Sequence, residues 1–300
     1  MNSLASAAAQ QGLLEAETAE PPFEILAPAR QTAALVVASP HSGDRYPQDF
    51  VARSRLDFAT LRRSEDSFVD ALFGAAPSRG APLIRALFPR AYIDPNREPF
   101  ELDPAMFAGK LPDYVNSRSP RVAAGLGTIA RVVANGEAIY QDKLDFADAE
   151  RRVARCYRPY HEALHALVEH TRVQFGYAML VDCHSMPSVG GPMERDPGAQ
   201  RVDFVLGDCH GTSCDRRLTD LADRMLRSMG YAVARNAPYS GGFTTQHYGK
   251  PGRSVHALQI EINRACYMDE FAYKPNADFA RIQRDLGELL AALAALELRA

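Results

Sequence analysis

The sequence predicts a single α/β domain whose sheet is mixed, mostly parallel and flanked by helices. Two observations support this. Short apolar runs bounded by polar turns alternate with stretches of helical periodicity, and no internal repeat or Gly/Ser-rich linker divides the 300 residues. We expect residues 23–300 to form this domain. Residues 1–22 are rich in Ala, Gln and Glu and are expected to form a disordered N-terminal arm.

Each expected strand is a short apolar run that stops at polar or turn-forming residues. Runs of this kind are typical of strands buried inside a sheet between layers of helices. In chain order, the expected strands are residues 33–38, 83–88, 91–93, 177–181, 202–206, 231–234 and 257–260.

The expected helices show apolar residues at spacings of three and four. Ser64 can cap a first helix over residues 64–73, and Pro159 predicts a kink or break within a long helix over 145–175. Two further helices are expected over residues 214–229, ended by Gly230, and from 276 to the end of the chain. Residues 95–120 are rich in Pro, lack periodicity and predict a loop that lines a site or wraps the surface.

Composition and charge argue against a nucleic-acid-binding, membrane-spanning or secreted protein. The net charge is −3 and no basic cluster stands out, so we expect no nucleic-acid partner. No apolar stretch is long enough to span a bilayer, and no Lys or Arg precedes Arg30 as a secretory signal would require. The five cysteines are scattered, odd in number and without a CxxC pair. This pattern predicts a reduced, cytoplasmic protein, and the oligomeric state is left open.

Three apolar runs are followed by a residue that can bind a metal or transfer a proton. His41 follows the run that begins at Ala33, His184 follows the run that begins at Tyr177, and Glu261 follows Ile260. Ligand sites in open α/β sheets lie beyond the carboxyl ends of the strands. Two imidazoles and a carboxylate at one sheet edge are the components of a hydrolytic zinc site.

Such a site needs a third ligand, usually an oxygen donor beside two histidines. Asp44 forms His41-x-x-Asp44, and Asp66 stands near the start of an expected helix, so both are candidates. Glu261 is then the free carboxylate that acts as general base and later as general acid. Ile260 and Ile262 on either side are expected to point to the opposite face and be buried.

A fourth segment brings arginine and asparagine to the same region. Asn96 and Arg97 follow an expected strand and can hold a substrate carboxylate, the Arg through a bidentate fork. Arg90 is seven residues earlier and can polarise a scissile carbonyl or hold its oxyanion.

The sequence also contains an H-E-x-x-H pattern from His161 to His165, which on a helix is typical of zincin-type proteases. His161 falls at helical spacing with Tyr157 and Leu164, which indicates a packing face. No downstream Gly-x-x-His extension follows and no third ligand is evident. We therefore favour an ordinary helix for this segment and keep the protease as an alternative.

Several motifs together resemble the N-formylglutamate amidohydrolase family, which is related in fold to zinc carboxypeptidases and aspartoacylases. The resemblance covers the chain from about Val36 to Glu270. The motifs are Ser39-Pro40-His41-Ser42-Gly43, the segment from Asp66 to Leu72, Asp94-Pro95-Asn96-Arg97, Asp182-Cys183-His184-Ser185-Met186-Pro187, Gly241-Gly242-Phe243, His247-Tyr248-Gly249-Lys250-Pro251, Glu261-Ile262-Asn263-Arg264 and Tyr267-Met268-Asp269-Glu270.

The resemblance implies a zinc-dependent amidase with a small acidic N-acyl amino acid as its substrate. The reaction implied is release of formate and glutamate from N-formyl-L-glutamate, a step of histidine degradation. It further implies that one zinc ion is bound by three residues, His41, Asp66 and His184. Alternatives on the same site are hydrolysis of another N-acyl amino acid or small peptide, or metabolite binding without catalysis.

The resemblance also assigns the remaining site residues. Glu261 is the general base, Arg90 supports the transition state, and Asn96 and Arg97 bind carboxylate. Gly241 and Gly242 suggest a flexible lid, and His247 beside them is expected to contact substrate. Pro95 departs from the Leu that is common in relatives, and the insert-like segment 99–121 is expected to reshape the pocket.

Overall fold

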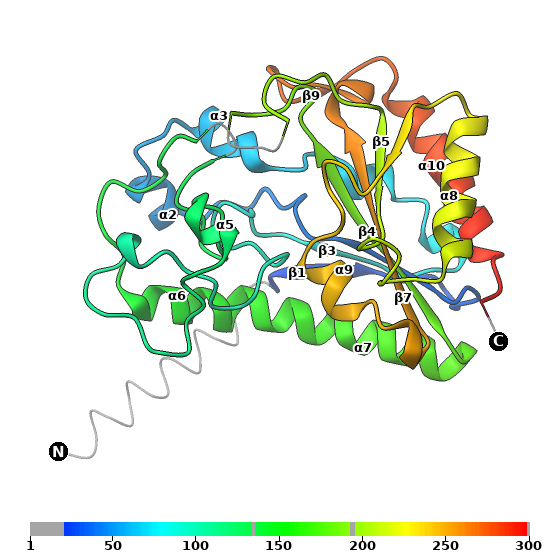
Figure 1. Ribbon diagram of the computed structural model, residues 1–300, viewed down its shortest axis with the longest axis horizontal. Helices are drawn as coiled ribbons and strands as arrows, with labels where there is room; N and C mark the ends of the chain where they lie inside the picture. Colours follow the sequence, from blue (N-terminus) through cyan, green and yellow to red (C-terminus); the bar gives the residue numbers. More distant parts are fainter. Residues whose placement is uncertain (1–20, 134–135, 193–195, 299–300) are drawn as a thin grey trace.

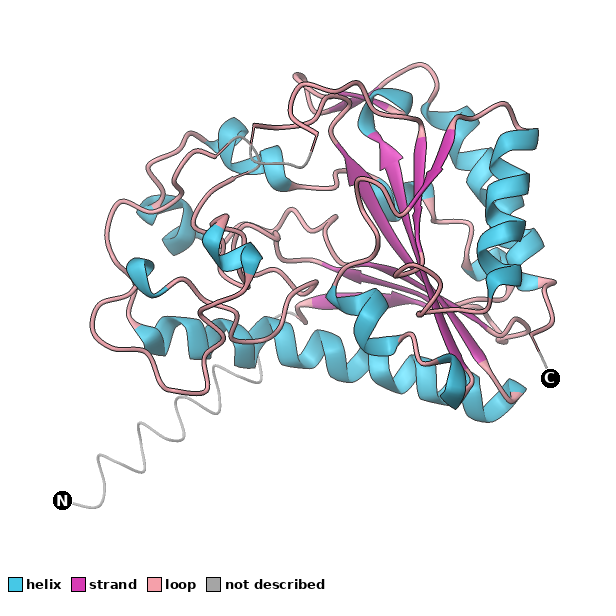
Figure 2. Cartoon of the chain, viewed as in Figure 1, coloured by secondary structure: helices cyan, strands magenta, loops and turns pink. Residues whose placement is uncertain are grey.

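The computed structural model describes residues 21–133, 136–192 and 196–298, and within them a seven-stranded sheet forms the centre of the molecule (Figures 1 and 2). The strand order is β1-β3-β2-β4-β7-β5-β6, with β1 and β5 antiparallel to the neighbours β3 and β7. All other neighbouring pairs are parallel. The mixed, mostly parallel sheet predicted from the sequence is thereby confirmed. The strands are β1 (Phe23–Leu26), β2 (Leu35–Ser39), β3 (Leu83–Ala86), β4 (Ala178–Met186), β5 (Phe204–Gly207), β6 (Val233–Arg235) and β7 (Val255–Asn263).

Helices cover both faces of the sheet. Figure 1 shows α7 (Arg158–Phe175) along one side, and α8 (Arg216–Ser228) beside α10 (Phe279–Ala294) on the other. Leu180 of β4 packs in the cluster that includes α7, whereas Val181 packs in the cluster that includes α8 and α10. This alternation follows from the two-residue period of a strand, and it leaves β4 and β7 buried along their whole length.

The short helices α2 (Gln48–Arg53), α3 (Phe58–Leu61), α5 (Pro120–Ala123) and α6 (Phe146–Arg152) lie beyond one end of the sheet, on the left in Figures 1 and 2. They are joined by long loops, as the Pro-rich composition of residues 95–120 predicts. A small hairpin is formed by β8 (Met268–Asp269) and β9 (Lys274–Pro275). Two more short helices, α4 (Val69–Leu72) and α9 (Phe243–Tyr248), lie against β4 of the sheet.

Several predicted boundaries were wrong. Residues 91–93 form a turn rather than a strand, with the Tyr92 and Ile93 amides bonded to Pro89 O. The predicted helix over 64–73 is reduced to α4, because Phe68 has a φ of 67° and interrupts the helical path. The long helix over 145–175 is interrupted by a π-helical segment, Val153–Tyr157, close to the break expected at Pro159.

The arm predicted over residues 1–22 lies outside the described residues up to position 20. Among the helices that the structure describes, none combines the length and apolar character required to cross a bilayer.

Candidate metal centre and active site

Four segments bring the predicted functional side chains to one place. His41 lies two residues beyond the end of β2, and His184 lies directly opposite Glu261 on the neighbouring strands β4 and β7. Both strands run further than predicted, so His184 and Glu261 are inside strands rather than after them. Asp66 precedes α4, and its amide donates to His41 O at 3.1 Å. This backbone bond ties the loop of the carboxylate to the loop of the first histidine.

Three donor atoms form a nearly regular triangle. The Nδ1 atoms of His41 and His184 are 3.1 Å apart, and Asp66 Oδ2 is 3.2 Å from the first and 3.1 Å from the second. All three side chains are buried, and among the described residues they form the cluster that could hold a metal ion. Four donors placed about 2.1 Å from a tetrahedral Zn²⁺ are separated by about 3.4 Å. The triangle therefore matches one face of such a coordination shell.

The partners of the outer ring nitrogens support this assignment. His41 Nε2 lies 2.8 Å from Asp94 Oδ1, and His184 Nε2 lies 3.0 Å from Asp182 Oδ1. A carboxylate beside Nε2 favours a proton on that nitrogen and leaves Nδ1 as a lone-pair donor, which is the usual support of metal-ligating histidines. Sequence reasoning assigned no role to Asp94 or Asp182. The signal for Asp182 was its position two residues before His184, on the same strand face.

Asp66 is oriented so that only one oxygen faces the histidines. Arg264 donates to Asp66 Oδ1 at 3.1 Å and the Ser185 hydroxyl donates to it at 3.3 Å. Burial raises the pKa of Asp66, but the adjacent His184 and His41 rings outweigh it and hold the pKa well below its usual range. The carboxylate is therefore ionised with Oδ2 directed at the two rings.

The site attracts positive charge. Burial lowers the pKa of His184, but the carboxylates of Asp182 and Asp66 raise it well above its usual range. Three lone-pair donors that converge within 3.2 Å require a proton or a metal ion between them. The donor set fits a divalent cation of the zinc type, which accepts nitrogen and oxygen ligands together.

Asp44, the other candidate for the third ligand, is exposed and is not part of this cluster. The structure thus brings Asp66, and not Asp44, to the two histidines. No local sequence pattern distinguishes the two, since the choice depends on the contact between the loop before α4 and the loop after β2.

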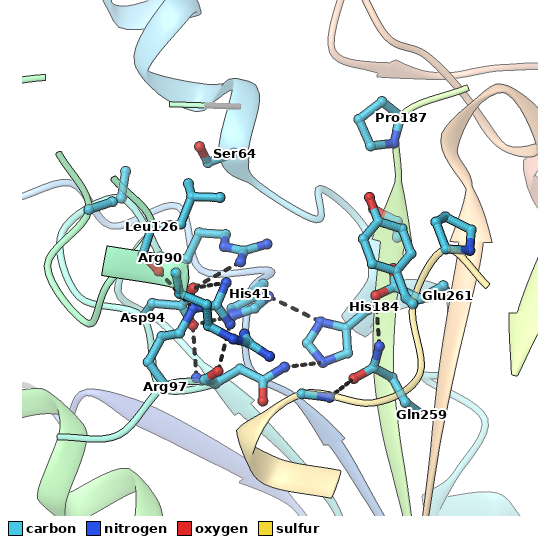
Figure 3. Close-up of a pocket in the computed structure, with 18 of the residues that line it drawn as sticks. His41, Ser64, Arg90, Asp94, Arg97, Leu126, His184, Pro187, Gln259 and Glu261 are labelled. Carbon is cyan, nitrogen blue, oxygen red and sulfur yellow. Dashed lines mark hydrogen bonds and ion pairs between the residues drawn. The ribbon is translucent and has the colours of Figure 1, made fainter. Parts of the chain in front are cut away.

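Glu261 points into a cavity of about 350 Å³ that His41 and His184 also line. Figure 3 shows it on the strand side of this cavity together with Gln259. Gln259 Nε2 donates to Glu261 Oε1 at 2.9 Å. Burial raises the pKa of Glu261 to about 7, although the His184 ring lowers it. A carboxylate with this pKa can both accept and return a proton near neutral pH. Ile260 and Ile262 are buried in the opposite face, as predicted.

Gln259 also fixes a loop at the rim of the cavity. Its Oε1 accepts from the Gly242 amide at 2.7 Å. A Cβ at Gly242 would lie 2.2 Å from Asn96 Nδ2, so only glycine allows this close approach. Gly241 and Gly242, predicted as a lid, are buried here and packed against the site. Sequence reasoning missed Gln259, whose signal was its position two residues before Glu261 on one strand face.

Arg90, Asn96 and Arg97 line the same cavity. Figure 3 shows Arg90 and Arg97 across from Glu261. Arg90 Nη2 is 2.8 Å from Asp94 Oδ2, and its Nη1 is 4.0 Å from Asp66 Oδ1. Burial lowers the pKa of Arg90, but both carboxylates reverse this and raise it. The Asn96 side chain accepts from the Thr244 amide and contacts His184 Nε2. The sequence prediction that these three residues meet at one site agrees with their positions.

His247 lies elsewhere. It is an exposed residue of α9 and lines a second hollow of about 320 Å³, together with His161 and His165 of α7. The structure therefore does not place His247 on the wall of the cavity that contains Glu261. The expected substrate contact would require a rearrangement of α9.

The H-E-x-x-H segment has a structural explanation. His161 Nε2 lies 2.8 Å from Pro95 O, so it is the protonated nitrogen, and Nδ1 faces the Tyr248 hydroxyl at 3.0 Å. Burial lowers the pKa of His161 to about 4, so the ring is neutral near pH 7. Tyr157, one turn earlier, donates to Arg97 O at 2.7 Å. Both side chains thus hold the backbone on either side of Asn96.

Comparison with known proteins identifies relatives along most of the chain. The family model of N-formylglutamate amidohydrolase matches residues 33–268. An N-formylglutamate deformylase from Pseudomonas putida is 31% identical over 268 residues, which cover 87% of this chain and 92% of the relative. One from Pseudomonas aeruginosa is 30% identical and covers 91% and 97%.

A solved structure gives the same result. The crystal structure of N-formylglutamate amidohydrolase from Ralstonia eutropha JMP134 superposes with a TM-score of 0.83 at 39% identity. The match covers 92% of this chain and 98% of that one. The resemblance stated from the sequence motifs is confirmed: the chain belongs to the N-formylglutamate amidohydrolase family.

Proposed function

We propose that this protein is a zinc-dependent amidohydrolase that converts N-formyl-L-glutamate to formate and L-glutamate. The observation that carries the proposal is the triangle of His41, His184 and Asp66, whose two histidines line the cavity into which Glu261 points. The names of the similar deformylases support the substrate. Bound zinc, held by these three residues, would act as a Lewis acid that acidifies water and polarises the formyl carbonyl.

The protein groups supply the proton transfers. Glu261 is positioned to take a proton from the attacking water and to deliver it to the amide nitrogen as the C–N bond breaks. Its raised pKa suits both steps. The amino group of glutamate then leaves neutral, and formate carries the new oxygen.

Binding and charge stabilisation come from the opposite wall. Arg90 lies between Asp94 and Asp66 and can donate to the oxyanion that develops on the formyl oxygen. Asn96 and Arg97 face the same cavity and are assigned to a substrate carboxylate. Arg97 is buried, and its pKa is lowered to about 10, so it keeps its charge near neutral pH.

We also propose a cytoplasmic location. All five cysteines lie in the described part of the chain and none forms a disulfide. Reduced thiols are usual in the cytoplasm.

A substrate panel tests the proposed reaction. With zinc present, we expect formate release from N-formyl-L-glutamate and much slower turnover of the N-acetyl and N-carbamoyl analogues, whose acyl groups are larger. The readout is formate or free amine. If only the N-acetyl or the N-carbamoyl analogue is hydrolysed, that compound and not N-formyl-L-glutamate is the substrate. Thermal stabilisation by every analogue without turnover of any would indicate a metabolite binder instead.

The zincin alternative makes an opposite prediction for His165. Replacing His165 by Ala is expected to leave zinc content and formate release unchanged, because this side chain is exposed on α7 and lines the second hollow. A zincin would lose a metal ligand in the same variant. Zinc content per chain and kcat measure the difference, and loss of both in His165→Ala would overturn the assignment of the metal site.

A further inference from the structure

We infer that Arg121 binds the side-chain carboxylate of the substrate and so makes the enzyme selective for N-acyl dicarboxylic amino acids. The inference rests on the proposed function and extends it to a residue with no assigned role. Arg121 belongs to α5, within the insert-like segment expected to reshape the pocket.

The cavity wall contains four arginines, Arg90, Arg97, Arg121 and Arg264. Three of them have a carboxylate nearby: Arg90 and Arg264 at 2.8 and 3.1 Å, and Arg97 at 3.7 Å. The guanidinium of Arg121 has no hydrogen bond or ion pair to any residue that the structure describes. A cation at a cavity wall without a partner is available to an anionic ligand.

Arg97 is less available than its position suggests. Its Nε donates to Leu126 O at 2.8 Å and its Nη1 donates to Asn96 O at 2.7 Å. Part of its fork is therefore committed to the protein backbone. The pKa of Arg97 is lowered chiefly by burial and further by the positive charges of Arg121 and Arg90. An anion between these cations would relieve their repulsion.

The backbone of Arg121 is firmly placed, although its guanidinium has no partner among the described residues. Ser119 caps α5 by accepting from the Val122 amide at 3.0 Å, and its hydroxyl contacts Glu101. The Leu126 amide donates to Arg121 O at 2.8 Å. Because Leu126 O accepts from Arg97, one bonded turn presents both arginines to the cavity. A fixed backbone reduces the cost of ordering the side chain on a ligand.

Charge in the cavity favours a doubly negative substrate. The wall carries more arginines than carboxylates, since Asp94 and Glu261 are the acidic residues that line it. N-Formyl-L-glutamate carries an α-carboxylate and a side-chain carboxylate. Asn96 and Arg97 are assigned to one substrate carboxylate; if this is the α-carboxylate, Arg121 is the cation on the cavity wall that remains for the side-chain carboxylate. At about 350 Å³ the cavity has the size of a small-molecule site.

Three isosteric substrates separate the two carboxylates. N-Formyl-L-glutamine lacks the side-chain charge, and N-formyl-L-isoglutamine lacks the α-charge. We expect Arg121→Met to lower kcat/KM for N-formyl-L-glutamate and for N-formyl-L-isoglutamine by about 10- to 100-fold, mainly through KM. For N-formyl-L-glutamine the change should be within about 3-fold, because its neutral side-chain amide forms no ion pair with Arg121. Arg121→Lys should keep an intermediate preference.

Arg118→Met is the matched control. Arg118 is exposed, lies three residues earlier and is not on the cavity wall, so all three substrates should keep the wild-type kcat/KM. Arg121→Gln serves as a second variant if Arg121→Met does not fold. Equal losses on all three substrates, or an unchanged preference for glutamate over glutamine, would overturn the role of Arg121.

Ligand-induced thermal stabilisation gives a readout that does not depend on turnover. The wild type should be stabilised more by N-formyl-L-glutamate than by N-formyl-L-glutamine, and Arg121→Met should lose this difference. If the wild type shows the difference but releases no formate, the proposed reaction fails and the binding role of Arg121 stands. If formate is released and the stabilisation difference survives Arg121→Met, the role of Arg121 fails alone.

Discussion

Glu261→Gln is expected to reduce formate release by about 10²- to 10⁴-fold while zinc remains bound. The substitution preserves the shape of the side chain and removes its ability to accept a proton. Glu261 is not part of the triangle of His41, His184 and Asp66, so the metal ligands stay in place. Steady-state kcat together with zinc content per chain measures both halves of the prediction.

Glu162→Gln is the matched control for this variant. Glu162 is the carboxylate of the H-E-x-x-H segment and is exposed on α7. Its replacement should leave kcat unchanged, whereas a zincin would lose its general base. Full activity in Glu261→Gln, or a large loss in Glu162→Gln, would show that the proton-transfer role belongs to another residue.

The parts of this site that the sequence could predict are those set by local pattern. The apolar runs before His41, His184 and Glu261 predicted three strands that reach one edge of a sheet, and the structure shows that these strands, β2, β4 and β7, are neighbours. The alternation of a strand then placed Ile260 and Ile262 in the core and Glu261 in the cavity. The same rule applies to Asp182 and Gln259, two residues before His184 and Glu261, which sequence reasoning did not exploit.

The parts that local pattern could not predict depend on contacts between distant segments. Asp66 was expected near the start of a helix, but its loop is fixed by a bond to His41 O, by the Ser185 hydroxyl and by Arg264. The strand expected at residues 91–93 is a turn because the amides of Tyr92 and Ile93 bond to Pro89 O nearby instead of to a neighbouring strand.

His247 and Arg121 illustrate the same limit at the cavity. The Gly-rich motif beside His247 suggested a substrate contact, but α9 directs this side chain to the second hollow. Arg121 reaches the cavity because Ser119 and Leu126 tie α5 to Glu101 and Arg97. Neither position is encoded in a short motif, since both depend on how loops pack beyond the sheet.

Asp66→Asn is expected to remove zinc and activity together. The amide keeps the size of the side chain but supplies a neutral oxygen in place of the carboxylate that faces His41 and His184. Loss of a direct ligand should weaken zinc binding by more than the roughly 10- to 100-fold that follows loss of an outer-shell partner. Zinc content after dialysis and calorimetric titration of zinc measure the affinity, and excess zinc should restore part of the activity.

Asp44→Asn is the matched control for Asp66→Asn. It also removes a negative charge near His41, but it leaves the three predicted metal ligands intact. Asp44 is exposed and lies outside the donor triangle, so its variant should keep stoichiometric zinc and wild-type kcat.

Arg264 loses its charged partner in Asp66→Asn, so we also expect this variant to have a lower melting temperature. Circular dichroism must therefore show that the variant is folded before its zinc content is measured. Full zinc retention in folded Asp66→Asn would refute Asp66 as a ligand. Together with Glu261→Gln, which keeps zinc but loses turnover, the pair distinguishes metal binding from proton transfer at one site.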